Sequence, residues 1–258
     1  MLEKFRRAKE AEIHVLRQMA ADETLPKPLS MQRPSLRRAL LSRGPGAVIA
    51  EYKRASPSKG LINAAWTPRQ AAEGYARAGA AALSVLTEEV HFQGSLDFLP
   101  VMAEPGLPVL RKDFLLHPLQ VLQTAATPAS ALLLIARMLT LAELEAMLVA
   151  CRDHGLEAVV EVFDTTDLAK AKAAAASIIQ VNNRDLDKLT TGLRISEELI
   201  EHRASGEVWI SASGMHSAED MRRMQGVGYD GLLIGTRLMQ ETDPGIALTK
   251  LLEEMNGA

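Results

Sequence analysis

Short apolar runs of strand length alternate with helical segments over most of this 258-residue chain. The strand-like runs are Ala47–Tyr52, Ala81–Leu86, Pro108–Leu110, Ala131–Ile135, Ala158–Val162, Ile178–Val181, Val208–Ser211 and Gly231–Ile234. The helical segments between them include Pro68–Ala78, Leu141–His154, Asp167–Ala176 and Ala218–Gln225. Because repeated strand–helix units build parallel sheets, eight of them predict an α/β fold, a (β/α)₈ TIM barrel.

A doubly wound open sheet is the main alternative to the barrel. Such a sheet usually carries a Gly-rich turn after its first strand. The residues at that point read Ser56-Pro57-Ser58-Lys59-Gly60, which is not such a turn. The barrel is therefore the predicted architecture.

The residues before the first strand predict a helical extension. Apolar residues at near-helical spacing indicate an amphipathic helix: Leu2, Phe5, Ile13, Leu16 and Met19. Prolines 26, 28 and 34 interrupt it, and Ser35 is a suitable N-cap for a second short helix that ends near Gly44. We expect residues 1–46 to extend a catalytic barrel of residues 47–258, with a single domain overall.

Charge and composition narrow the classes of function. A net charge of −3 and an aromatic content of 4% give no support for nucleic-acid binding. The most apolar region, 131–150, is interrupted by three charged residues, and the first twenty residues do not resemble a secretory leader. The single cysteine, Cys151, excludes an internal disulfide and favours a reducing compartment. We expect a cytoplasmic protein without a membrane partner.

Polar residues stand at the C-terminal ends of several predicted strands. Glu51 and Lys53 share one face at the end of the first strand, and Lys112 follows the third. Glu161 and Asn182 end the fifth and sixth strands. Because a barrel draws its reacting groups from these strand ends, the inward positions predict an active site at the barrel mouth.

Small residues follow the seventh and eighth strands, as Ser213-Gly214 and Gly235-Thr236. Barrels usually hold phosphate at these two loops, where backbone amides can cradle it, although a tight turn alone would also explain each glycine. The pattern predicts a phosphorylated small-molecule ligand. The six histidines show no spacing typical of metal ligands, so we expect no metal and no organic cofactor.

Several motifs together resemble the indole-3-glycerol phosphate synthase family. The most specific are EYKRASPS (51–58), LRKDF (110–114) and NNRDL (182–186), in that order. The resemblance implies a phosphate-binding barrel of tryptophan biosynthesis with an N-terminal helical extension. Such an enzyme converts 1-(2-carboxyphenylamino)-1-deoxyribulose 5-phosphate into indole-3-glycerol phosphate and releases CO₂ and water.

The resemblance also implies catalytic roles. Lys112 matches the family's general acid and Glu161 its proposed base. Lys53, paired with Glu51, matches the group that holds the substrate carboxylate or protonates the leaving hydroxyl. A lysine that acts as an acid near neutral pH needs a lowered pKa, and we expect the apolar cavity and the second lysine to lower it.

The remaining implied roles concern binding. The residues expected to bind or support the substrate are Asn182, Arg184 and Ser213. The residues expected at the phosphate are Ser56, Gly214, Gly235 and Thr236. The candidates for an apolar wall around the aromatic ring, with plain core packing as the alternative, are Phe114, Phe92 and Leu133.

Two positions depart from the family pattern. Ala212 stands where the family usually has an inward glutamate, and Gln180 stands where a glycine is common. Our hypothesis is that Gln180 reaches into the space beside Ala212 and supplies a neutral polar contact there. We expect a working synthase that is slower or has a shifted pH dependence.

Two other functions stay open. One is a family paralogue with an altered substrate, and the other is a non-catalytic barrel that binds a phosphate ligand. The lysine pair and the carboxylate base argue against the second, because binding alone needs no such set. We expect a monomer or a weak homo-oligomer.

Overall fold

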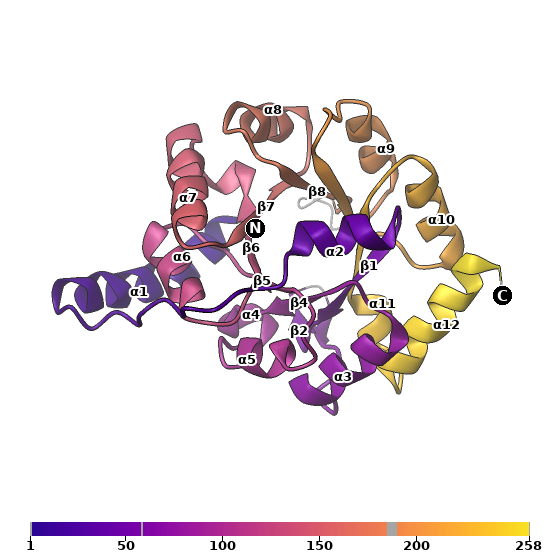
Figure 1. Ribbon diagram of the computed structural model, residues 1–258, viewed down its shortest axis with the longest axis horizontal. Helices are drawn as coiled ribbons and strands as arrows, with labels where there is room; N and C mark the ends of the chain where they lie inside the picture. Colours follow the sequence, from indigo (N-terminus) through magenta and orange to yellow (C-terminus); the bar gives the residue numbers. More distant parts are fainter. Residues whose placement is uncertain (1, 58, 185–189, 258) are drawn as a thin grey trace.

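In the computed structural model, eight parallel strands close a barrel and helices surround it (Figure 1). The structure describes residues 2–57, 59–184 and 190–257. The barrel strands are β1 (Ala47–Tyr52), β4 (Ala82–Leu86), β5 (Val109–Lys112), β6 (Ala131–Ile135), β7 (Glu157–Val162), β8 (Ile178–Asn182), β9 (Val208–Ala212) and β10 (Gly231–Ile234). They pair in chain order, and β10 closes the ring against β1. The predicted (β/α)₈ barrel is confirmed.

Helix α3 (Pro68–Ala78) begins where its local capping signal predicts. Thr67 accepts a hydrogen bond from the Gln70 backbone, and the Gln70 side chain accepts one from the Thr67 backbone. This capping box starts α3 at the predicted Pro68. The helices are α3 (Pro68–Ala78), α4 (Glu89–Phe92), α5 (Phe98–Ala103), α6 (Pro118–Ala125), η1 (Ala136–Met138), α7 (Leu141–Asp153), α8 (Thr165–Ala173), α9 (Arg194–Ile200), α10 (Ala218–Gly226), α11 (Thr236–Met239) and α12 (Pro244–Asn256).

Side chains of the strands alternate between the barrel interior and the layer of helices. The interior is filled by one cluster that includes Ile49, Leu110, Val159, Ile178 and Ile210. Their sequence neighbours, such as Val48, Val160, Ile179 and Trp209, belong to the second cluster, which packs against the helices. A polar residue two positions after an interior residue therefore points into the barrel near its mouth.

Helix α2 (Leu36–Arg43) closes the N-terminal end of the barrel. Ser35 caps it, as predicted, and the Ser35 hydroxyl also donates to Glu157 at the start of β7 over 2.7 Å. Leu40 is fully buried, and its side chain lies so close to Gly231, the first residue of β10, that a Cβ there would meet it at 3.2 Å. In Figure 1, α2 lies across the middle of the ring of helices.

Helix α1 (Leu2–Ala21) lies at the opposite end. It buries Phe5 and Leu16 and extends past α6 at the left of Figure 1. The segment between α1 and α2 runs beside the end of α6, where Leu29 N donates to Ala125 O over 2.9 Å. The residues that precede the barrel in sequence therefore contact both of its ends.

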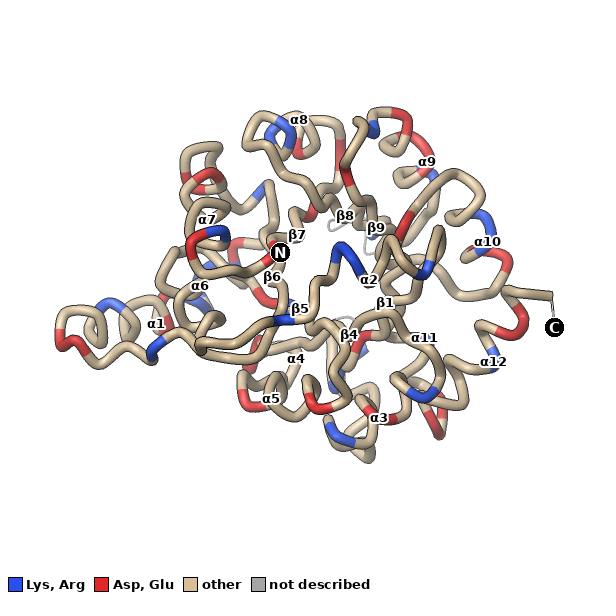
Figure 2. The backbone as a smooth tube through the Cα atoms, in the orientation of Figure 1, with Lys and Arg blue, Asp and Glu red and all other residues tan. Residues whose placement is uncertain are grey.

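Charged positions of both signs are interspersed along the outer helices (Figure 2). Some of them pair between helices, as where Arg223 Nε of α10 lies 2.6 Å from Glu197 Oε1 of α9. Of the helices that the structure describes, none combines the length and the apolar character needed to cross a membrane.

Candidate active site

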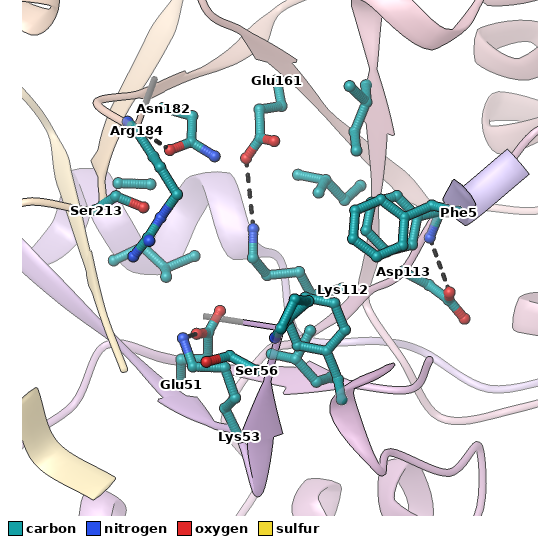
Figure 3. A pocket seen from close by; sticks show the side chains of 18 of the residues that line it. Phe5, Glu51, Lys53, Ser56, Lys112, Asp113, Glu161, Asn182, Arg184 and Ser213 are labelled. Carbon is teal, nitrogen blue, oxygen red and sulfur yellow. Dashed lines mark hydrogen bonds and ion pairs between the residues drawn. The ribbon is translucent and has the colours of Figure 1, made fainter. Parts of the chain in front are cut away.

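A cavity opens at the C-terminal ends of the barrel strands, and most of the predicted site residues line it (Figure 3). Those that line it are Glu51, Lys53, Ser56, Phe92, Lys112, Phe114, Leu133, Glu161, Asn182, Arg184, Ser213 and Thr236. The predicted Gly214 and Gly235 do not line it, although each follows or precedes a lining residue. Ser58, Asp185 and Leu186 of the motifs lie outside the described residues.

The end of β1 supplies a buried ion pair. Lys53 Nζ lies 2.8 Å from Glu51 Oε1, and Ser84 donates a hydrogen bond to Glu51 Oε2 over 3.4 Å. Burial by itself would raise the pKa of Glu51, but the charges of Lys53 and Lys112 outweigh it. The pKa of Glu51 lies below its ordinary value, so the side chain is an anion at neutral pH.

Gly235 makes the room that Glu51 occupies. A Cβ at position 235 would lie 2.4 Å from Glu51 Oε1 and 2.9 Å from Glu51 Cβ. No side chain fits there unless the carboxylate moves. The sequence predicted Gly235 as part of a phosphate cradle, and it missed this steric relation to the ion pair on the neighbouring strand.

Lys112 of β5 and Glu161 of β7 meet across the cavity. The Lys112 ammonium lies 3.4 Å from Glu161 Oε2, and Glu161 is only 2% exposed. Burial lowers the pKa of Lys112, but the nearby carboxylates of Glu161 and Glu51 raise it more, and the pKa lies above its ordinary value. The expected lowered pKa is therefore wrong, because two anions outweigh the apolar surroundings. Lys112 is an ammonium at neutral pH.

Gln180 does not make the contact that the sequence suggested. It is fully buried, it does not line the cavity, and its side-chain Nε2 donates to Glu161 Oε2 over 2.5 Å. The hypothesis that Gln180 fills the space beside Ala212 is therefore wrong. Ala212 itself lines the cavity. The amide instead reaches the neighbouring strand, because β7 and β8 pair with Glu161 opposite Gln180.

The turn after β9 is held by a residue that sequence reasoning missed. Ser213 and Gly214 have φ of 68° and 79°, a left-handed conformation that few residues other than glycine adopt readily. The fully buried Asn183 donates to Ser213 O over 3.1 Å and to Ser211 Oγ over 2.9 Å. Asn183 stands beside the predicted Asn182 in the NNRDL motif, but its side chain points away from the cavity and supports the Ser213 turn.

Aromatic side chains form the wall of the cavity that lies opposite Asn182. Phe5 of α1 stacks on Phe114 with ring centroids 4.0 Å apart and planes 9° apart, and Phe92 lies 6.1 Å from both rings. Figure 3 shows Phe5 on the side of the cavity away from Asn182. The sequence identified Phe92 and Phe114 but placed Phe5 only on a helix face.

Other lining residues were also missed: Leu2, Pro57, Leu86, Asp113, Ile135, Phe163 and Leu233. The alternation of strand side chains offered a signal for four of them. Leu86 has the inward parity of Ser84, and Leu233 has that of Gly231. Ile135 has the parity of Leu133, and Phe163 has that of Glu161. Nothing in the local pattern indicated that Leu2 would lie at the barrel mouth.

A buried ionic network seats α1 at the mouth. Asp113 Oδ1 lies 2.7 Å from Lys9 Nζ, and Asp113 Oδ2 lies 3.1 Å from Arg111 and accepts from Thr87 over 2.7 Å. Burial would raise the pKa of Asp113, but Arg111 and Lys9 lower it below its ordinary value. Because Lys9 stands one helical turn after Phe5, the network also fixes the aromatic wall.

The chemistry of the cavity follows from these neighbours. Two ammonium groups, each beside a carboxylate, face a site with an aromatic end, so the cavity can bind an anionic aromatic compound, donate protons and accept one. Within the described part of the chain, no group of His, Cys, Asp and Glu side chains is arranged to hold a metal ion.

Comparison with known proteins relates the chain to one family. The family model described as indole-3-glycerol phosphate synthase matches residues 2–251. A protein named indole-3-glycerol phosphate synthase from Carboxydothermus hydrogenoformans is 41% identical over 240 residues, which cover 92% of this chain and 90% of the relative. One of the same name from Desulfosudis oleivorans is 40% identical over 238 residues, covering 92% and 89%.

Solved structures of lower identity share the fold. A 3-hexulose-6-phosphate synthase from Salmonella typhimurium superposes with a TM-score of 0.64 at 12% identity, over 81% of this chain and 99% of that chain. KGPDC from Streptococcus mutans gives a TM-score of 0.61 at 15% identity, over 81% and 97%. These similarities concern the barrel alone.

Proposed function

This chain belongs to the indole-3-glycerol phosphate synthase family, and on that premise we propose that it catalyses the family's reaction. The substrate is 1-(2-carboxyphenylamino)-1-deoxyribulose 5-phosphate, and the products are indole-3-glycerol phosphate, CO₂ and water. The observation that carries the proposal is the Lys112–Glu161 pair, at 3.4 Å, inside a cavity with one aromatic wall. We further propose a cytoplasmic location, a monomer or weak homo-oligomer, and one domain with residues 1–46 as its extension.

The proposed binding mode follows the two ends of the cavity. The apolar wall of Phe5, Phe92 and Phe114 suits the substrate's benzene ring. Ser56, Ser213 and Thr236 line the cavity elsewhere and suit the phosphate, with the backbone of Gly214 and Gly235 adjacent. In this mode Asn182 and Arg184 bind the sugar part of the substrate, and Leu133 adds to the apolar wall.

Ring closure joins the benzene carbon that bears the carboxylate to the ketone carbon. The carbonyl π electrons move to the oxygen, and the Lys112 ammonium donates a proton to it. An alkoxide is far more basic than an amine, so a lysine with a raised pKa still protonates it. The bond to the carboxylate then breaks, CO₂ leaves, and the electron pair restores the aromatic ring.

Loss of water completes the reaction. Lys53, held by Glu51, donates a proton to the leaving hydroxyl, and Glu161 takes the proton that is lost as the indole double bond forms. Two protons enter and one leaves, and the difference balances the carboxylate charge that is lost as CO₂. Position 212 on β9 is an alanine and cannot accept a proton, so in the proposal Glu161 alone takes this one.

The direct test is to mix the purified protein with the carboxyphenylamino substrate. We expect indole fluorescence to appear, together with one CO₂ for each substrate consumed. Mass spectrometry of the product distinguishes indole-3-glycerol phosphate from any other indole. A wild-type protein that binds the substrate without forming product would instead favour a phosphate-binding barrel.

Gly235→Ala is expected to lower kcat about 10- to 100-fold, because a displacement of about 1 Å at a catalytic group can have that effect. The new methyl group would collide with Glu51 and move it away from Lys53. Steady-state kinetics with the same substrate measure the loss. The matched control is Gly226→Ala, whose methyl group would meet nothing within 4 Å. Equal kcat for Gly235→Ala and the control would contradict the part assigned to Glu51.

A further inference from the structure

We propose that Gln180 is a positioning residue that orients Glu161 for its part as base. This inference rests on the proposed function. Gln180 is fully buried one layer below the cavity, between Ile178 and Asn182 on the inner face of β8. Its Nε2 lies 2.5 Å from Glu161 Oε2.

The two ends of the Gln180 amide differ in a way that points to function. The donor end faces the carboxylate of Glu161. An ionised carboxylate has no proton to donate and therefore needs hydrogen-bond donors around it. The carbonyl oxygen, Oε1, is buried and has no hydrogen-bond partner within the described residues. A buried carbonyl without a partner destabilises a protein, and an apolar side chain of similar size would avoid that cost. The glutamine is therefore explained by what its donor end does.

The Gln180 hydrogen bond acts on the same oxygen as Lys112. Glu161 Oε2 accepts from Gln180 over 2.5 Å and lies 3.4 Å from the Lys112 ammonium. Two donors on one oxygen fix the plane of the carboxylate and hold it toward Lys112. Because Glu161 lines the cavity, we assign its other oxygen, Oε1, to the proton transfer with the substrate. A base works best when its reacting atom is held in this way.

Gln180→Met tests the proposal, because methionine has a similar length but cannot donate. We expect kcat to fall about 10- to 100-fold, while KM changes less than about twofold. In a Glu161→Gln background the same change is expected to have no further effect, since Gln180 acts only through that carboxylate. The matched control is Ser130→Ala, which also removes a buried polar atom without a partner among the described residues. Ser130 lies directly before β6, and its substitution should leave kcat unchanged.

A crystal structure of Gln180→Met gives a readout that does not need activity. We expect the Glu161 carboxylate to turn and to separate from Lys112. An unchanged carboxylate would overturn the proposal, and so would equal losses from Gln180→Met in the wild-type and Glu161→Gln backgrounds. If the wild-type protein forms no product, the proposed function fails. The orientation of the Glu161 carboxylate in crystals of wild type and Gln180→Met then decides by itself whether Gln180 positions that carboxylate. Gln180→Leu replaces the methionine variant if that protein does not fold.

Discussion

Lys112→Met is expected to lower kcat by about 10²- to 10⁴-fold, the range that general acid–base catalysis typically contributes. Methionine keeps the length of the side chain but removes its proton and its charge. The Lys112–Glu161 pair is largely buried, so few water molecules can reach the reacting oxygen in the variant. Water is also a weaker acid than an ammonium group, and it does not replace Lys112 as the proton donor. Product formation measured by indole fluorescence gives the effect.

Two measurements make the Lys112 result specific. A circular dichroism spectrum and an unfolding curve show whether the variant is still folded. Lys250→Met, at an exposed position of α12, changes the same residue type and should keep full activity. Substantial product formation by folded Lys112→Met would show that the assigned acid is wrong, even though the chain belongs to the family.

Asp113→Ala is expected to lower the free energy of unfolding by about 3–5 kcal/mol, the usual effect of removing one partner from a buried ion pair. The substitution removes the fully buried carboxylate that Arg111 and Lys9 share and leaves these two cations with the partly exposed Glu12, which lies 3.4 Å and 2.7 Å from them. For a chain of this size the loss corresponds to a fall in Tm of about 6–20 °C. Urea unfolding at pH 7 measures it, and Asp153→Ala on the surface of α7 serves as the control.

The Asp113 effect is expected to depend on pH. The pKa of Asp113 is lowered in the folded protein, so its contribution to stability is present above the unfolded value of about 3.9. The contribution is lost as the pH falls through the still lower folded pKa. The difference in unfolding free energy between wild type and Asp113→Ala should therefore shrink below about pH 4. A difference that stays constant from pH 7 to pH 3 would contradict the assigned network.

The positions of the proposed catalytic groups could be predicted from sequence because they follow simple strand parity. Glu51 is two residues after Ile49, and Glu161 is two residues after Val159, so each continues the interior face of its strand. The barrel then brings all strand ends to one mouth, whatever the details of packing. The role of Asn183 could not be predicted in the same way, because its side chain points outward. It donates to Ser213 O in the turn after β9 and accepts from Ser196 N of α9, and both contacts depend on how α9 packs against the barrel.

By itself the sequence determined the strand–helix alternation, the caps of α2 and α3 and the inward parity of the proposed reacting groups, since each depends on a few neighbouring residues. Only the tertiary structure decided what surrounds those groups. It brought Phe5 from the first helix onto Phe114, and it placed two carboxylates close enough to raise the pKa of Lys112. It also turned Gln180 toward Glu161. Contacts of this kind join residues far apart in the chain, and their energies depend on distances and burial that no local pattern specifies.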